Sequence, residues 1–187
     1  MLFGKPGAGK GTQAAFLKSK YQLFHLSTGD LFRYHINSLT DLGMLAKSYM
    51  DKGDLVPDQI TIDMLREAVN KNSDAKGFIF DGFPRTTAQA DALDTFLLNK
   101  SMRITATIAL EAGDDLLIER LVNRGKTSGR VDDQDEIKIR NRFNEYNNKT
   151  ASLKSFYTAQ GKFYSVNGIG SVEEITKRLT GLIDGLL

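Results

Sequence analysis

A glycine-rich segment near the N-terminus, residues 4–12, lies between a short apolar run and a helical pattern. It reads Gly-Lys-Pro-Gly-Ala-Gly-Lys-Gly-Thr, and Gly4, Gly9 and Lys10 have the spacing of a phosphate-binding loop. Glycines let backbone N–H groups turn inward around an anion, the following helix directs its positive end there, and Lys10 adds a mobile charge. Gly11 departs from the strict pattern, because Ser or Thr is expected there and Thr12 comes one position later. The strand-to-helix setting favours a phosphate-binding loop over an ordinary turn with a surface lysine.

The composition limits the class of protein and its partners. A chain of 187 residues, 41% of them hydrophobic, is long enough for one α/β core with small inserted segments. The absence of cysteine excludes disulfides and cysteine-liganded zinc, and it fits the cytoplasmic location that we expect. The net charge of +2 gives no reason to expect a nucleic acid partner, and no apolar run is long enough to predict contact with a membrane.

Apolar segments of strand-like composition alternate with helical patterns along the chain. We predict strands at residues 1–3, 23–27, 78–81, 104–110 and 162–166, with helices between and after them. Ser171 and Glu174 have the spacing of a capping box, which predicts the start of the last helix. This alternation predicts an α/β fold in which a five-stranded parallel sheet has helices on both faces, forming three layers. The first apolar run is shorter than a usual central strand, so we expect a few residues to precede Met1 in the natural protein.

A helical flap is expected between two elements of this core, at about residues 28–57. Residues 31–52 look helical but only weakly amphipathic, and Gly43 and Gly53 punctuate them. Pro57 and the acid that follows it predict the start of the next helix. We therefore expect a small mobile segment here rather than another layer of the core.

A short lid is expected at about residues 121–131. A helix that includes the first residues of the lid is predicted to end at Gly125. A long helix is predicted to begin at Asp132 and Asp133. Arginines are frequent on both sides of this glycine-rich loop: Arg120, Arg124, Arg130, Arg140 and Arg142. Charges in such a region are usually solvated, but their concentration in a short span predicts a mobile lid lined with arginine.

Asp81 ends the predicted strand 78–81, on the sheet edge that also carries the phosphate-binding loop. An acid in this position can hold Mg²⁺ or its water ligands, and beside a phosphate loop we favour that role over a simple strand-end cap. Gly82 then allows a tight turn, and Arg85 follows on the same edge. His25 lies in the strand 23–27, and we assign it no role because most histidines there serve packing.

The arginines near the phosphate-binding loop indicate the kind of chemistry. A triphosphate and a monophosphate repel each other strongly, so cations must bridge them before an oxygen of one attacks the phosphorus of the other. The sequence shows no arrangement of Ser with His, Cys with His or paired carboxylates. Positioning and electrostatic stabilisation are sufficient for direct in-line phosphoryl transfer.

Five segments together carry a resemblance to one family: residues 4–12, Ser27-Thr28-Gly29-Asp30, Gly53 with Leu55-Val56-Pro57, Asp81 to Thr86 with Gln89, and Ser128-Gly129-Arg130 with Asp132-Asp133. Over essentially its whole length the chain resembles adenylate kinases of the short-lid type, which are nucleoside monophosphate kinases with the P-loop NTPase fold. The resemblance implies one domain over residues 1–187 and the reversible reaction ATP + AMP ⇌ 2 ADP. It also implies Mg²⁺ with ATP, a monomeric enzyme, and ATP, AMP and ADP as its partners.

The resemblance also implies roles for individual residues. The residues matching the ATP site are Gly7, Ala8, Gly9, Lys10, Gly11, Thr12, Arg120, Arg124 and Gly170. The residues matching the AMP site are Thr28, Arg33, Leu55, Val56, Pro57, Gly82, Phe83, Arg85, Gln89, Arg130 and Arg142, with Gln89 on the adenine edge. Those expected to act on the transferred phosphate are Lys10, Arg85, Arg120, Arg130 and Arg142. Asp81, through water, and Thr12 would hold Mg²⁺.

One arginine on the lid side has two possible assignments. Counting forward from Asp133 reaches Asn141, whereas counting back from Tyr146 reaches Arg142, because this segment holds one residue more than the usual spacing of the family. We choose Arg142 and keep Arg140 in reserve. The lid is too short for the zinc-binding insertion of some relatives, so no structural zinc is expected.

Two alternative functions remain open on the sequence. A UMP/CMP kinase would share the fold and reaction, but Thr28 and Gln89 favour adenine because an amide can pair with the donor and acceptor of that base. An ATP-dependent switch module would share the phosphate-binding loop. Such a module has no need of the AMP-side residues Arg33, Arg85 and Gln89.

Overall fold

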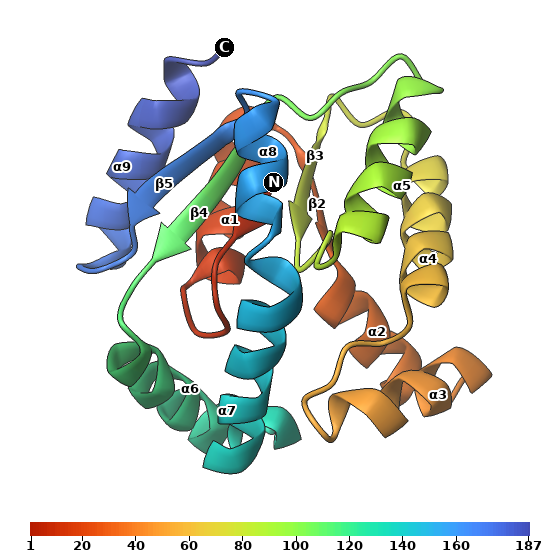
Figure 1. The fold of residues 1–187 in the computed structure, drawn as a ribbon, viewed down its shortest axis with the longest axis vertical. Coiled ribbons are helices and arrows are strands. Elements are labelled where there is room, and N and C mark those ends of the chain that lie inside the picture. The colour runs from red at the N-terminus through yellow and green to blue at the C-terminus, as the bar shows by residue number, and fades with distance from the viewer.

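The computed structural model describes residues 1–187 and contains one five-stranded parallel sheet (Figure 1). Its strands are β1 (Leu2–Phe3), β2 (Phe24–Ser27), β3 (Phe78–Asp81), β4 (Thr107–Glu111) and β5 (Phe163–Asn167). They lie in the order β2-β3-β1-β4-β5. Because β1 is central and the chain passes from it to both sides of the sheet, the loop after β1 emerges at the point where such folds bind ligands.

Helices cover both faces of the sheet, which confirms the predicted three-layer α/β fold. The helices α1 (Lys10–Tyr21) and α9 (Val172–Asp184) pack on one face, and α4 (Asp58–Lys71), α5 (Thr87–Leu98) and α8 (Leu153–Ala159) pack on the other. Successive residues of a strand point to opposite faces. Leu2 accordingly packs in the core with α1 and α9, whereas Phe3 packs with Ala90 of α5 and Tyr157 of α8.

The flap consists of two short helices, α2 (Thr28–Asn37) and α3 (Asp41–Met50), which lie beyond the carboxyl ends of β2 and β3 (Figure 1). The prediction that Gly43 punctuates this segment is wrong, because Gly43 lies inside α3. The break comes instead at Leu39, which has a left-handed backbone. A Cβ atom at Gly43 would lie 2.1 Å from the carbonyl oxygen of His35, so glycine is needed there for the close packing of α3 on α2.

The lid region differs from the prediction at both helix ends. The helix α6 (Asp114–Ser128) continues through Gly125, and a 3₁₀ turn (Val131–Asp133) precedes α7 (Glu136–Glu145). A Cβ atom at Gly125 would lie 2.6 Å from the carbonyl oxygen of Asp133, so this glycine permits a close approach rather than ending the helix. Asp135 caps α7, and Asp132 and Asp133 therefore do not start it. A π-helical turn (Tyr146–Thr150) connects α7 to α8.

Two further predictions were tested by the fold. The strand predicted at 104–110 begins later, at Thr107, and Ile104 instead packs in the core beside α4 and α5. The capping box predicted for the last helix is confirmed, because Ser171 and Glu174 hydrogen bond reciprocally at the start of α9. None of the helices combines the length and the apolar character that crossing a membrane would require.

Candidate active site

The loop between β1 and α1 places Lys10 at the centre of the sheet's carboxyl edge. Gly9 is the N-cap of α1 and has a left-handed backbone, so the loop turns directly into the helix. Lys10 Nζ donates to the carbonyl oxygens of Gly4 and Lys5, at 2.8 Å and 3.1 Å. Desolvation lowers the pKa of Lys10 to about 8, and the charge of Asp81 opposes this shift only in part. The loop therefore holds a cation that an incoming anion would stabilise.

A cavity of about 800 Å³ extends from this loop to the lid. Of the phosphate-loop residues singled out in the sequence, Gly7, Gly9, Lys10, Gly11 and Thr12 line it, whereas Ala8 is fully buried and does not. The cationic side chains lining it are Lys10, Arg33, Arg85, Arg120, Arg124, Arg130 and Arg142, and the carboxylates are Asp30 and Asp81. Such an excess of positive charge suits a ligand that carries several negative charges.

Asp81 and Thr12 line the same cavity, where the sequence predicts a magnesium site. Burial alone would raise the pKa of Asp81, but its contact with His25 and the charge of Lys10 lower it, which favours the carboxylate. His25 Nε2 lies 3.4 Å from Asp81 Oδ2 and has no other polar partner. The charged carboxylate and the hydroxyl of Thr12 are oxygen ligands that fit Mg²⁺.

The lid arginines are organised around Asp133, whose side chain is fully buried. Arg124 Nε and Nη2 donate to the two carboxylate oxygens of Asp133, at 2.6 Å and 3.0 Å. Arg142 Nη1 donates to Asp133 Oδ1 at 2.7 Å and also pairs with Asp132. Both arginines are thereby held at the wall of the cavity, on α6 and α7.

Of the two candidates on α7, the structure places Arg142 in the cavity and Arg140 outside it. Arg140 is exposed and pairs with Glu136 one turn earlier on the same helix. The helix α7 is continuous up to Glu145, and the residue reached by counting back from Tyr146, Arg142, is the one that lines the cavity.

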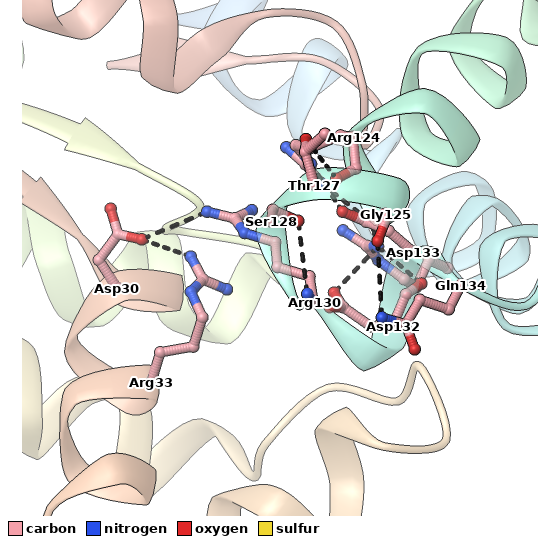
Figure 2. Close-up of polar contacts among 11 residues, drawn as sticks. Asp30, Arg33, Arg124, Gly125, Thr127, Ser128, Arg130, Asp132, Asp133 and Gln134 are labelled. Atoms are coloured by element: carbon pink, nitrogen blue, oxygen red, sulfur yellow. Dashed lines mark hydrogen bonds and ion pairs between the residues drawn. The ribbon is translucent and has the colours of Figure 1, made fainter.

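Arg130 joins the lid to the flap. Figure 2 shows Asp30, at the start of α2, facing both Arg130 and Arg33. Arg130 Nη2 lies 3.6 Å from Asp30 Oδ1, and Arg33 Nη2 donates to the same oxygen. Burial and the nearby charges of Arg33 and Arg124 lower the pKa of Arg130. The resemblance assigns Arg33 and Arg130 to substrate phosphates. In this structure the carboxylate of Asp30 lies between these two arginines.

A second, adjoining cavity lies between the flap and β3. The predicted AMP-site residues that line it are Thr28, Arg33, Leu55, Val56, Gly82, Arg85, Gln89 and Arg142. Phe83 lines a neighbouring hollow together with Lys10 and Arg85, whereas Pro57 is exposed and lines neither cavity. Thr28 Oγ1 and Arg85 Nε both donate to the carbonyl oxygen of Gly82, at 3.0 Å and 2.8 Å, which fixes the turn after β3.

Arg85 lies where the two cavities meet, and it lines both. Desolvation and the charge of Arg142 lower its pKa to about 10, and Asp81 opposes this shift. Its guanidinium therefore remains charged at neutral pH, at the point where ligands in the two cavities would come together. Arg120 and Gly170 also line the large cavity, and Arg120 Nη2 donates to the carbonyl oxygen of Gly168, close in the chain to Gly170.

Several residues that organise the site were missed in the sequence. Asp30, Asp58 and Asp133 each accept hydrogen bonds from side chains of the site, and His25 contacts Asp81. Asp133 was interpreted as a helix start and His25 as a packing residue. The only signal for these acids in the sequence was that acids occur close to many of the arginines along the chain. Proximity in the sequence does not show which arginine or amide from another helix an acid will contact.

Comparisons with known proteins agree with this geometry. A family model described as adenylate kinase matches residues 2–162. The chain is 67% identical to an adenylate kinase of Flavobacterium psychrophilum and 60% identical to one of Flavobacterium johnsoniae, over 100% of this chain and 98% of each relative. It is 43% identical to an adenylate kinase of Porphyromonas gingivalis, over 98% of this chain and 94% of that protein. The phosphate-binding loop, the arginine-lined cavities and these likenesses together show that the chain belongs to the adenylate kinase family.

Proposed function

We propose that this protein catalyses ATP + AMP ⇌ 2 ADP, with ATP in the large cavity beside the phosphate-binding loop and AMP in the cavity under the flap. The observation that carries the proposal is the position of Arg85, which lines both cavities and lies among the charges of Lys10 and Arg142. A phosphoryl group that passes between two nucleotides needs cations at that junction, because charge spreads over its oxygens as it moves. No covalent intermediate on the protein is required.

The residues divide into three roles in this proposal. Lys10 and the loop N–H groups bind the outer phosphates of ATP, with Arg120 and Gly170 at its adenine. Arg33 and Arg85 hold the phosphate of AMP, and Thr28 and Gln89 lie at its base. Arg124, Arg130 and Arg142 bridge the two phosphate chains. Positioning the reactants in line and neutralising their repulsion account for the rate enhancement.

Adenylate kinases generally use ATP together with Mg²⁺, and we propose that Asp81, through water, and Thr12 hold the ion here. No group of three or more His, Cys, Asp or Glu side chains could form a protein-only metal site. This fits Mg²⁺, which usually keeps several waters and binds through one or two protein oxygens and the substrate phosphates. Bound there, the ion would neutralise charge on the phosphates of ATP.

We also propose that residues 28–57 and the lid at about 121–131 move as units around a single nucleoside monophosphate kinase domain. Phe32, Ala46 and Val56 of the flap form a small apolar cluster with Met64 of α4, separate from the clusters that pack on the sheet, which supports movement of the flap as a unit. Closure would exclude water from the phosphates and so suppress ATP hydrolysis. We also propose that the enzyme acts as a monomer.

Acceptor profiling tests the proposal. With MgATP as donor, ADP formation is measured with AMP, GMP, CMP or UMP, and we expect kcat/KM to be highest for AMP by about 100-fold or more. UMP or CMP as the preferred acceptor would indicate a UMP/CMP kinase, which the family assignment does not favour. Slow ATP hydrolysis that no monophosphate changes would indicate a switch module instead.

A further inference from the structure

The amide of Gln89 is held at both ends by other groups of the protein, at its oxygen by the backbone of Arg85 and at its nitrogen by the side chain of Asp58. Gln89 is buried, with 2% of its surface exposed, and it lies in the first turn of α5. Its Oε1 accepts a hydrogen bond of 2.7 Å from the backbone N–H of Arg85. Its Nε2 donates a hydrogen bond of 2.7 Å to Asp58 Oδ1. Asp58 itself does not line the cavity and stands behind Gln89 as the first residue of α4.

The chemistry of these two partners fixes which way the amide points. A backbone N–H can only donate and a carboxylate can only accept, so Gln89 must direct its oxygen to Arg85 and its nitrogen to Asp58. Rotating the amide by half a turn would place two donors together at Arg85 and two acceptors together at Asp58. Buried polar groups left unpaired in this way are costly, so the flipped orientation is strongly disfavoured.

Asp58 is itself held in place, so it can impose this orientation. Its second oxygen, Oδ2, accepts a hydrogen bond of 2.8 Å from Thr86 Oγ1. Thr86 is the N-cap of α5, and its hydroxyl oxygen accepts from the backbone N–H of Gln89. One carboxylate therefore ties the start of α4 to the start of α5 and leaves each of its oxygens with a defined donor.

The Gln89 amide keeps one N–H and one oxygen lone pair free, and Gln89 lines the flap cavity. Adenine presents the amino donor N6 next to the acceptor N1, which matches a free Oε1 beside a free Nε2–H. Hypoxanthine, the base of IMP, presents the acceptor O6 and the donor N1–H in the same places. IMP would pair correctly only with the flipped amide.

We propose that Asp58 is a positioning residue that determines base specificity, because it fixes the Gln89 amide in the orientation that pairs with adenine and rejects 6-oxopurines. This inference rests on the proposed function, which puts the base of AMP against Gln89. Asp58 does not contact the substrate and acts only through Gln89. The chemical class that it excludes is the 6-oxopurine nucleoside monophosphates, of which IMP is the simplest probe.

The test is the Asp58→Asn variant, assayed for kcat/KM with AMP and with IMP at saturating MgATP. Asparagine has nearly the shape of aspartate, but its amide can donate to the oxygen of a flipped Gln89. The side chain at position 58 then no longer discriminates between the two orientations of the Gln89 amide, and only the backbone N–H of Arg85 still favours the native one. We expect the preference for AMP over IMP to fall about tenfold or more, with KM for ATP unchanged. A purely structural role of Asp58 would lower both activities together and leave their ratio unchanged.

The matched control is Asp63→Asn on the same helix, because Asp63 also accepts from a glutamine amide, that of Gln59, but on the exposed surface. We expect this control to keep the wild-type ratio. Asp58→Ala, checked for folding by thermal unfolding, gives a second measurement. It should also lower the ratio of kcat/KM for AMP to kcat/KM for IMP. An unchanged ratio in folded Asp58→Asn and Asp58→Ala would overturn the inference. Failure of the wild-type enzyme to phosphorylate AMP would instead refute the proposed function, and the inference with it.

Discussion

Arg142 Nη1 lies 2.7 Å from the fully buried carboxylate of Asp133, which also binds Arg124 through both of its oxygens. One acid thus fixes two arginines that come from different helices, α6 and α7. Without Asp133, Arg124 and Arg142 would lose the carboxylate that both of them contact at the cavity wall. Asp133 is therefore expected to matter for both stability and turnover, although no role in binding a nucleotide is assigned to it.

We expect Asp133→Asn to lower the free energy of unfolding by about 1–3 kcal/mol at pH 7, since a buried charged hydrogen-bond acceptor is lost. The low end is expected because Arg124 is partly exposed and solvent screens its charge. Turnover should fall as well. Urea unfolding followed by circular dichroism measures the first effect, and Glu136→Gln, which removes a surface pair with Arg140, is the control. Equal stability of Asp133→Asn and wild type would contradict this role.

The same pair predicts a dependence of stability on pH. Burial raises the pKa of Asp133, but the hydrogen bond and charge of Arg124, together with Arg142, lower it below its usual value. A group whose pKa is lowered by folding stabilises the protein above its unfolded pKa of about 3.9, and this contribution disappears as the pH falls through the folded pKa. The stability difference between wild type and Asp133→Asn should therefore shrink between about pH 5 and pH 3. A difference that stays constant over this range would be inconsistent with the pair.

Arg142 and Arg140 lie on the same helix and differ in their environment, which makes them a matched pair for mutation. We expect Arg142→Ala to lower kcat/KM about 100-fold or more, because it removes a charge from the junction of the cavities. Arg140→Ala removes only an exposed pair with Glu136 and should stay within about twofold of wild type. Steady-state kinetics with ATP and AMP measure kcat/KM for both variants. A larger loss of kcat/KM in Arg140→Ala than in Arg142→Ala would assign the phosphate role to Arg140 instead.

Lys10 predicts that nucleotide binding is linked to proton uptake. Its pKa of about 8 in the free protein means that it loses its charge as the pH rises above neutrality. Phosphate anions beside it would raise that pKa, so ATP binding near pH 9 should take up protons and affinity should fall as the pH rises. Calorimetry in buffers of different ionisation enthalpy measures this uptake. Lys10→Met should abolish most of it, whereas Lys18→Met, at an exposed position of α1, should not.

The contact between Arg130 and Asp30 predicts that the lid and flap approach each other when phosphates replace the carboxylate. The chain has no cysteine, so Ser48→Cys in the flap and Thr127→Cys in the lid allow specific labelling at two exposed positions. We expect energy transfer between the labels to increase when a bisubstrate analogue with two adenosines joined by a phosphate chain is added. Energy transfer that does not respond to the analogue would argue against closure.

Local sequence patterns predicted the parts of this protein that depend on neighbouring residues. The phosphate-binding loop, the five strands and the capping box at Ser171 follow from spacing and backbone preferences over a few positions. Counting within one continuous helix also led to Arg142, which lines the cavity, whereas Arg140 does not. Glycine was less informative, since Gly43 and Gly125 lie inside helices at points of close approach.

Only the tertiary structure decided which acids hold the arginines and the glutamine of the site. Asp58 meets Gln89 across two helices, Asp133 joins α6 to α7, and Asp30 brings the flap to the lid. The positions of these acids along the chain do not reveal their partners, because a carboxylate accepts from whichever donor the packing of distant elements brings within about 3 Å. The sequence by itself therefore determined which chemistry the chain contains. Folding determined how the charged and amide groups are oriented, since burial makes each of them depend on a partner from another element.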